Sequence, residues 1–359
     1  YKGQALALRG MSLFDLTKLY GYPYTYDNGA SLGASIVTDV VDKDYMPQRS
    51  TVAQCYEQII NDLEASINLL GEKFNKGKIN KWAALTLLSR VYLYHGDNEK
   101  ALNAAKAAIE GAESHQYQLW TNEEYPTAWS NDVSEASTNK GEVLFEIINL
   151  TTDSPGKESL GYLYSPSGYA DACVTASFYN ELSKDPNDVR LKVINVAEKK
   201  QYSSSSIYGR GYVNKYQPQQ GENVEDANIP LIRLSEAYLN AAEADMHLNG
   251  EGSTTAKNYI DALRKRANAA EKSAYTLNDI LDERAREFYT EGYRRTDLIR
   301  FNQFGGNQAT YSWAGKGGTM SGGEYVAGGR FEAFRNVYPL PASEVQANRN
   351  LTQIDGYNE

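Results

Sequence analysis

The feature that most constrains the fold is a helical segment that is apolar on two sides. Between Asn80 and His95, apolar residues recur every three or four positions along two separate stripes. A helix of this kind is stable only when neighbours cover both stripes. Gly96 and Asp97 interrupt the pattern, and the alanine-rich segment 101–108 follows, where small side chains allow close contact between helices. We therefore predict a helix hairpin inside a larger stack of helices.

A second hairpin of the same design lies later in the chain. Segments 232–250 and 254–268 both repeat apolar residues with helical spacing, and alanines recur at their packing positions. The first hairpin covers about 32 residues, close to the 34-residue tetratricopeptide unit. Self-similar helix pairs that pack on one another are typical of repeat proteins. The two hairpins therefore indicate a helical repeat array.

Between the helical blocks lies sequence of another kind. Residues 113–228 show little helical periodicity, "EVLFEIIN" at 142–149 reads as a buried strand, and loops rich in Ser, Gly, Asn and Tyr surround it. Long loops on a rigid scaffold often carry binding function. We predict a mainly α fold, in which a tetratricopeptide-like helical repeat scaffold carries a loop-rich insertion with short strands.

This interpretation divides the chain into four parts. We expect an incomplete helical scaffold at 1–112, an irregular ligand-binding part at 113–228, and further helix pairs at 229–303. A glycine-rich loop and a C-terminal return segment follow at 304–359. The first residues already follow a helical pattern without a preceding cap or signal peptide, so we also expect the numbering to begin inside a longer protein.

Composition excludes several classes of function. The net charge is −10, and acidic and basic residues are mixed, so there is no basic stripe of the kind that binds nucleic acid. Two cysteines and three scattered histidines offer neither zinc spacing nor a redox pair. No run approaches the roughly 18 apolar residues of a membrane span. We predict no metal, no cofactor and no nucleic-acid partner.

The charged segment 283–301 contains the best catalytic candidates. Glu287 and Glu291 lie one helical turn apart, a spacing that the carboxylate pair of a glycosidase could have. Arginines at this density, however, favour ionised carboxylates and oppose the proton donor that hydrolysis needs. We therefore favour a structural ion-pair network, with an α-helical glycoside hydrolase as the alternative. The predicted network consists of Glu283, Arg284, Glu287, Glu291, Arg294, Asp297 and Arg300.

Aromatic residues in the loops are the remaining functional signal. The chain has 28 tyrosines, and many of them stand beside Asn, Gln, Asp and Arg in irregular segments. Flat rings can stack on the C–H faces of a sugar while planar polar groups reach its hydroxyls. The alternative is that most of these rings pack under their own loops. The candidate ligand-binding residues are Trp120, Trp129, Tyr164, Tyr202, Tyr208, Arg210 and Trp313.

Four phrases in order resemble the SusD/RagB family of surface glycan-binding lipoproteins of Bacteroidetes. "ERAREFYTEGYRRTDLIRF" at 283–301 is similar to the family's most diagnostic phrase, and "PLIRLSEAYLNAAEA" at 230–244 to the one that precedes it. "YPLPASEVQANRNLTQIDGY" at 338–357 resembles the family's closing segment, and "ALALRGMSLFDLTKLYGYPY" at 5–24 an early helix. The resemblance spans essentially the whole chain.

The resemblance implies a tetratricopeptide-like scaffold with a loop-rich part that carries the ligand, and no enzymatic activity. It also implies a lipid anchor on the outer face of the outer membrane and a SusC-like TonB-dependent transporter as partner. The expected function is polysaccharide utilization: capture of an oligosaccharide at the cell surface and its delivery to that transporter. A peptide-binding repeat protein stays open, because some members of the family serve peptide uptake.

Overall fold

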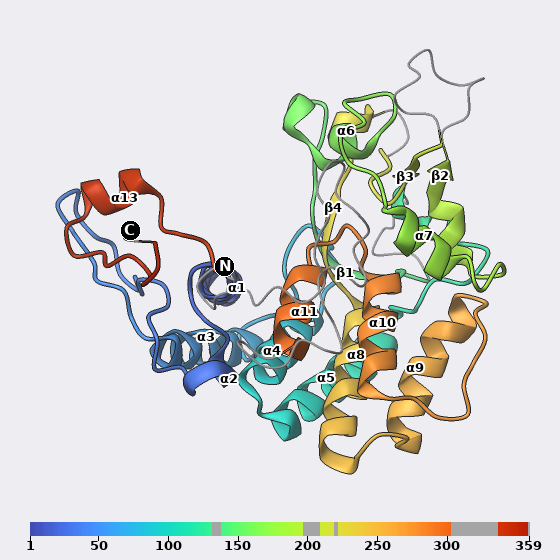
Figure 1. The fold of residues 1–359 in the computed structure, drawn as a ribbon, viewed down its shortest axis with the longest axis horizontal. Coiled ribbons are helices and arrows are strands. Elements are labelled where there is room, and N and C mark those ends of the chain that lie inside the picture. Colours follow the sequence, from blue (N-terminus) through green and yellow to red (C-terminus); the bar gives the residue numbers. More distant parts are fainter. Residues whose placement is uncertain (131–137, 197–208, 219–221, 303–336, 358–359) are drawn as a thin grey trace.

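The structure, a computed structural model, describes residues 1–130, 138–196, 209–218, 222–302 and 337–357. Helices packed side by side form one part of the molecule, and a loop-rich part with the strands lies at one end of them (Figure 1). The segment that carries the C-terminus lies beside the first helices (Figure 1). The mainly α fold with short strands that the sequence predicts is confirmed.

The chain begins with a pair of packed helices. Helix α1 (Lys2–Tyr20) lies against α3 (Val52–Ile67), and the short helix α2 (Tyr24–Asp27) lies between them in sequence. A capping box of Thr51 and Gln54 starts α3. Asp62 on α3 forms an ion pair with Arg9 on α1, with 2.6 Å between Oδ1 and Nη2. This pair of helices forms one side of the main apolar core.

Helix α4 is the centre of the helical part. It spans Lys81–His95 and contacts α3, α5 (Asn98–Ser114) and α8, which confirms that both of its apolar sides are covered. The Asn80 side chain accepts a hydrogen bond from the backbone N–H of Ala83 and caps α4. Gly96, at φ +92°, ends the helix in the left-handed conformation that glycine adopts at little cost. The predicted hairpin is therefore present.

Four further helices extend the stack. Helices α8 (Leu234–Asn249) and α9 (Thr254–Arg266) form the second predicted hairpin. Helix α10 (Leu277–Glu287) starts at a capping box of Thr276 and Asp279, and a turn through Gly292, at φ +84°, leads to α11 (Arg294–Asn302). Helix α13 (Ala342–Ala347) lies in the C-terminal segment, where Asn348 and Asn350 donate hydrogen bonds to the backbone of 46–47.

The loop-rich part contains two small antiparallel sheets. Strand β1 (Val143–Ile147) pairs with β4 (Ile229–Arg233), and β2 (Ile194–Val196) pairs with β3 (Gly211–Val213). Strand β1 confirms the strand predicted within 142–149. Two short helices, α6 (Leu160–Tyr164) and α7 (Ala176–Leu182), complete this part. No helix among the described residues is long and apolar enough to span a bilayer.

Candidate functional site

A buried group of charged side chains joins the loop-rich part to the helices. We call it the ion-pair hub, and it balances five carboxylates with five cations. Some members lie just before β1, in β4, and in the 3-10 helix at Val189–Val193 or immediately before it. Others lie in α9 and α10 or in the residues that follow β3 and α10. The hub consists of Glu142, Asp188, Arg190, Lys215, Arg233, Arg264, Arg266, Glu283, Glu287 and Glu291.

Glu287, on α10, lies at the centre of the hub. Its Oε1 is 2.6 Å from Nη2 of Arg266 and 2.8 Å from Nη1 of Arg233, and its Oε2 is 3.4 Å from Nη1 of Arg190. Arg190 belongs to the loop-rich part, Arg233 ends β4 and Arg266 ends α9. One buried carboxylate therefore joins three elements that are far apart in the sequence.

The neighbouring carboxylates of the same segment make equally specific contacts. Glu283 lies 2.7 Å from Arg190 and 2.6 Å from Arg264. Glu291 accepts hydrogen bonds from Nζ of Lys215 at 2.6 Å and from Nε of Arg233 at 2.8 Å. The three acids that stand one turn apart in the sequence are therefore each paired with cations from other elements.

The second half of the segment pairs with the helical scaffold. Nε of Arg284 lies 2.8 Å from Asp297, which also accepts a hydrogen bond from Arg300 at 3.0 Å. Arg300 forms a further ion pair with Glu243 on α8. Arg294 donates a hydrogen bond to the backbone carbonyl of Leu281. Segment 283–301 thus binds the loop-rich part through its first half and α8 through its second.

These pairings determine the protonation of the carboxyl groups. Burial raises the pKa of Glu287, but the charges of Arg266, Arg233 and Arg190 lower it more, and the net pKa is well below the usual range. Glu283 follows the same pattern, and its pKa falls to about 2. Both groups are ionised at neutral pH and covered by protein. Neither is suited to donate a proton to a glycosidic oxygen.

The predicted tryptophans lie inside the loop-rich part. Trp120 and Trp129 expose only 4% and 6% of their surface and form a T-shaped pair with centroids 5.0 Å apart. Tyr125 packs edge-on against both rings. The indole of Trp129 also lies under the cations of Arg233 and Lys215, at about 5 Å. Both indole rings are covered in this structure, and they connect the hub to the apolar cluster of the loop-rich part, which includes Val189 and Val213.

Tyrosines on and beside α6 provide more accessible rings. Tyr164 is half-buried and stacks on Tyr216, with centroids 5.5 Å apart and planes 16° from parallel. The Tyr216 hydroxyl donates a 2.7 Å hydrogen bond to the Thr290 carbonyl, which fixes that ring beside the hub. Tyr162 packs edge-on against Tyr169, and Tyr169 is 48% exposed. Tyr164 is therefore supported by stacking on Tyr216, a residue that the sequence analysis did not select.

Arg210 lies in the loop-rich part, next to β3. It is exposed and precedes β3, and the backbone N–H of Val174 donates a 2.9 Å hydrogen bond to the carbonyl of the next residue, Gly211. The segment that follows α6 is thus connected to the strand beside Arg210. Three further predicted ligand residues, Tyr202, Tyr208 and Trp313, lie outside the described residues. Within the described part of the chain, no group of three His, Cys, Asp or Glu side chains could hold a metal ion.

Sequence families match nearly the whole chain. The model described as "SusD family" matches residues 105–357, and the one described as "Starch-binding associating with outer membrane" matches residues 1–93. A curated relative, the starch-binding protein SusD of Bacteroides thetaiotaomicron, is 40% identical over 154 residues, which are 43% of this chain and 26% of that protein. The chain therefore matches only about a quarter of the length of that relative.

Solved structures agree with the sequence families. A protein of Bacteroides vulgatus described as sugar binding is 52% identical, has a TM-score of 0.86, and is matched over 99% of this chain and 77% of its own. A SusD superfamily protein of Bacteroides thetaiotaomicron is 34% identical, with a TM-score of 0.81 and coverage of 98% and 77%. The phrases at 230–244 and 283–301, which form β4, α8, α10 and α11, lie inside the matched region. The chain belongs to the SusD family.

Proposed function

We propose that this chain is a non-catalytic glycan-binding protein that captures an oligosaccharide with its loop-rich part and delivers it to a SusC-like TonB-dependent transporter. Membership of the SusD family supports the ligand class, and so does a relative named for starch binding. The family resemblance is the support for the transporter and for a location on the outer face of the outer membrane, reached through a lipid anchor.

The stacked pair of Tyr164 and Tyr216 is the observation that carries the binding proposal. Tyr216 is fixed by its hydrogen bond to Thr290, and the ring of Tyr164 stacks on it. Because Tyr164 is already held in place, ligand binding costs less conformational entropy. Tyr169, nearly half exposed, adds a second ring beside α6. Sugar rings stack on such faces through their C–H groups, and an exposed guanidinium such as that of Arg210 can donate hydrogen bonds to hydroxyls.

The state of the carboxylates favours binding without turnover. Hydrolysis of a glycosidic bond requires a protonated acid beside the leaving oxygen, together with a second carboxylate that contacts the sugar or its attacking water. Glu287 is ionised and enclosed by arginines, and Glu291 is occupied by Lys215 and Arg233. These two residues therefore hold the scaffold together instead of serving a hydrolase.

A titration calorimeter can test the proposal with soluble glycans and peptides. We expect maltoheptaose or another neutral oligosaccharide to bind, peptides of similar length to give no heat, and Tyr164→Ala to weaken glycan binding about tenfold because a stacking face is lost. Incubation of the same glycans with the protein should release no reducing sugar. Peptide binding in place of glycan binding, or sugar release that Glu287→Gln abolishes, would replace this proposal with one of its alternatives.

A further inference from the structure

A cleft on the helical scaffold lies away from the tyrosines of α6. Its larger chamber has a volume of about 590 Å³ and is lined by α2, α4, α8 and α11 together with their adjoining turns. A smaller chamber of about 40 Å³ adjoins it, because Pro23, Tyr94, Ile299 and Arg300 line both. Small-molecule sites usually have volumes of several hundred Å³. The cleft is therefore large enough for a ligand.

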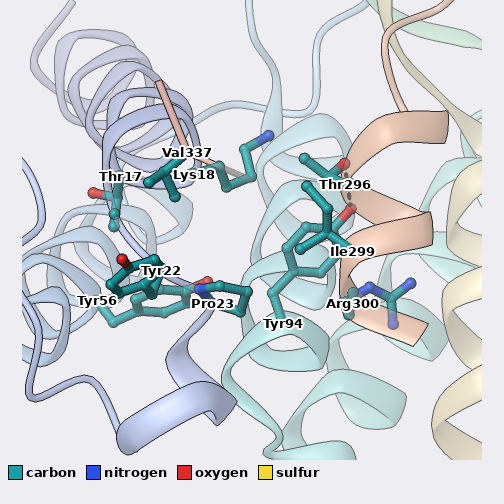
Figure 2. A pocket seen from close by; sticks show the side chains of 11 residues that line it. Thr17, Lys18, Tyr22, Pro23, Tyr56, Tyr94, Thr296, Ile299, Arg300 and Val337 are labelled. Carbon is teal, nitrogen blue, oxygen red and sulfur yellow. Dashed lines mark hydrogen bonds between the residues drawn. The ribbon is translucent and has the colours of Figure 1, made fainter. Parts of the chain in front are cut away.

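The segment 20–26 contributes two tyrosines to one wall of this cleft, Tyr22 in the smaller chamber and Tyr26 in the larger one. In "YGYPYTY", at 20–26, Gly21 and Pro23 end α1, and tyrosines occupy alternate positions. Tyr22 and Tyr26 pack together with centroids 4.9 Å apart, and Tyr26 remains 45% exposed. Figure 2 shows Tyr22 and Pro23 on one side of the smaller chamber and Tyr94 with Ile299 on the other. This wall offers flat rings in a region that the proposed glycan site does not use.

The opposite wall combines apolar side chains, such as Ile299 and Leu277, with charged groups that compensate one another. Arg300 lies between the rings of Tyr94 and Phe301, at 4.6 and 4.8 Å from their centroids, and forms ion pairs with Glu243 and Asp297. Burial raises the pKa of Glu243, but Arg300 lowers it to about 2, so the carboxylate stays ionised. A charged ligand would meet cations and anions that already have partners.

Two further hydrogen-bonding side chains complete the larger chamber. Asn98, in the first turn of α5, contributes an amide, and His247, near the end of α8, contributes an imidazole 3.8 Å from Glu243. The volume of about 590 Å³ lies within the range of small-molecule sites, which is enough for one or two sugar rings. Tyrosine faces, an amide and an imidazole around a balanced ion pair suit a neutral polyhydroxyl ligand.

We propose that this cleft is a second sugar site, which takes one or two neutral sugar rings between α2 and α11. None of the residues that line it belongs to α6, which lies above α11 in the view of Figure 1, so the two sites do not share residues. The inference takes only its ligand class from the proposed function. A rigid body with two sites can hold a glycan at either, or two segments of a long glycan at once.

Histidine signals offer a direct test, because the chain has only three histidines and one of them lines the cleft. Imidazole nuclear magnetic resonance spectra would be recorded while maltose, cellobiose or laminaribiose is added, with His247→Gln to assign the signal. We expect at least one disaccharide to shift the His247 resonance and to leave that of His115, which pairs with Glu72, unchanged. An acidic disaccharide such as digalacturonic acid should bind much more weakly.

Two sets of variants separate this site from the proposed glycan site. Tyr26→Ala and Asn98→Ala should each raise the disaccharide dissociation constant measured at His247 about tenfold. Tyr169→Ala should leave this dissociation constant unchanged. Thermal unfolding of each variant shows that it is folded. If none of the disaccharides moves His247 at tens of millimolar while maltoheptaose binding still depends on Tyr164, the cleft site is wrong and the proposed function stands. A His247 response without any Tyr164-dependent binding supports the cleft and removes the proposed site at α6.

Discussion

The helical scaffold and the loop-rich part differ in the balance of forces that hold them. Where α4, α5 and α8 meet, many contacts are made by small apolar side chains, beside one buried ion pair of Arg90 with Glu236, and the alanines at this interface are fully buried. They include Ala83, Ala84, Ala101, Ala105, Ala237 and Ala241. Contacts of this kind are non-directional, and their strength follows the apolar area removed from water. The helical part therefore gains stability from many interchangeable contacts.

The loop-rich part is joined to the helices by ion pairs with defined geometry. Arg190 and Lys215, both buried, reach carboxylates of the segment that follows α9. A buried ion pair gains little over apolar packing, but it becomes strongly destabilising when one partner is lost. We therefore expect the helices to tolerate small changes in shape, and the ion-pair hub to be destabilised by the loss of any one charge.

The largest expected loss of stability comes from removing a charge in the ion-pair hub. Glu287→Gln keeps the shape of the side chain but removes its charge, and it leaves Arg190, Arg233 and Arg266 short of one buried counter-charge. We expect the free energy of unfolding in urea to fall by about 3–5 kcal/mol. Asp44→Asn, which removes the exposed ion pair with Lys43, is the matched control and should have no measurable effect. Equal stability of the two variants would contradict the distinction drawn between the regions.

Acid should destabilise the ion-pair hub before it affects the packing of the alanines between α4, α5 and α8. The folded pKa of Glu283 is about 2, against 4.5 for the unfolded group, so the unfolded state binds more protons between these values and stability falls as pH falls through them. Glu283 alone contributes on the order of 3 kcal/mol at neutral pH. Urea unfolding at pH 6 and pH 3 checks this, and Glu283→Gln should reduce the dependence on pH. If the free energy of unfolding of Glu283→Gln depends on pH as strongly as that of the wild type, Glu283 is not the group responsible.

A conservative change in the scaffold should have the smallest effect. Ile59 is fully buried on α3 within the main apolar core, and Ile59→Val removes one methylene without adding or removing charge. We expect a loss of about 1 kcal/mol in the free energy of unfolding, with no dependence on pH. Measurement under the same urea conditions places this value beside that of Glu287→Gln. A loss as large as that of Glu287→Gln would mean that the helical scaffold is as sensitive to substitution as the ion-pair hub.

The helices could be predicted from the sequence because their determinants are local. Thr51 with Gln54 and Thr276 with Asp279 form capping boxes three residues apart, and the two-sided pattern of α4 requires only helical periodicity. The charge density of 283–301 likewise indicated ion pairs. Their partners could not be predicted, because Arg190 lies 93 residues before Glu283 in the chain and only the fold brings them together.

The proposed ligand site was less predictable for the same physical reason. Trp120 and Trp129 have the ring chemistry of a sugar platform, but whether a ring faces solvent or a core depends on what covers it, and composition does not record that. Tyr216 supports Tyr164 from another segment, and no local pattern joins the two. Tyr26 and His247 are separated by most of the chain and meet only across the cleft.

Titration of a soluble oligosaccharide into paired tyrosine variants tests the central claim most directly. Tyr169 in the loop-rich part and Tyr45 beside the first helices are each 48% exposed, so Tyr169→Ala and Tyr45→Ala remove equally accessible rings from the two regions. We predict that calorimetry with maltoheptaose shows wild-type affinity for Tyr45→Ala and about tenfold weaker binding for Tyr169→Ala. Equal affinities in the two variants would contradict a glycan site on the tyrosines of α6.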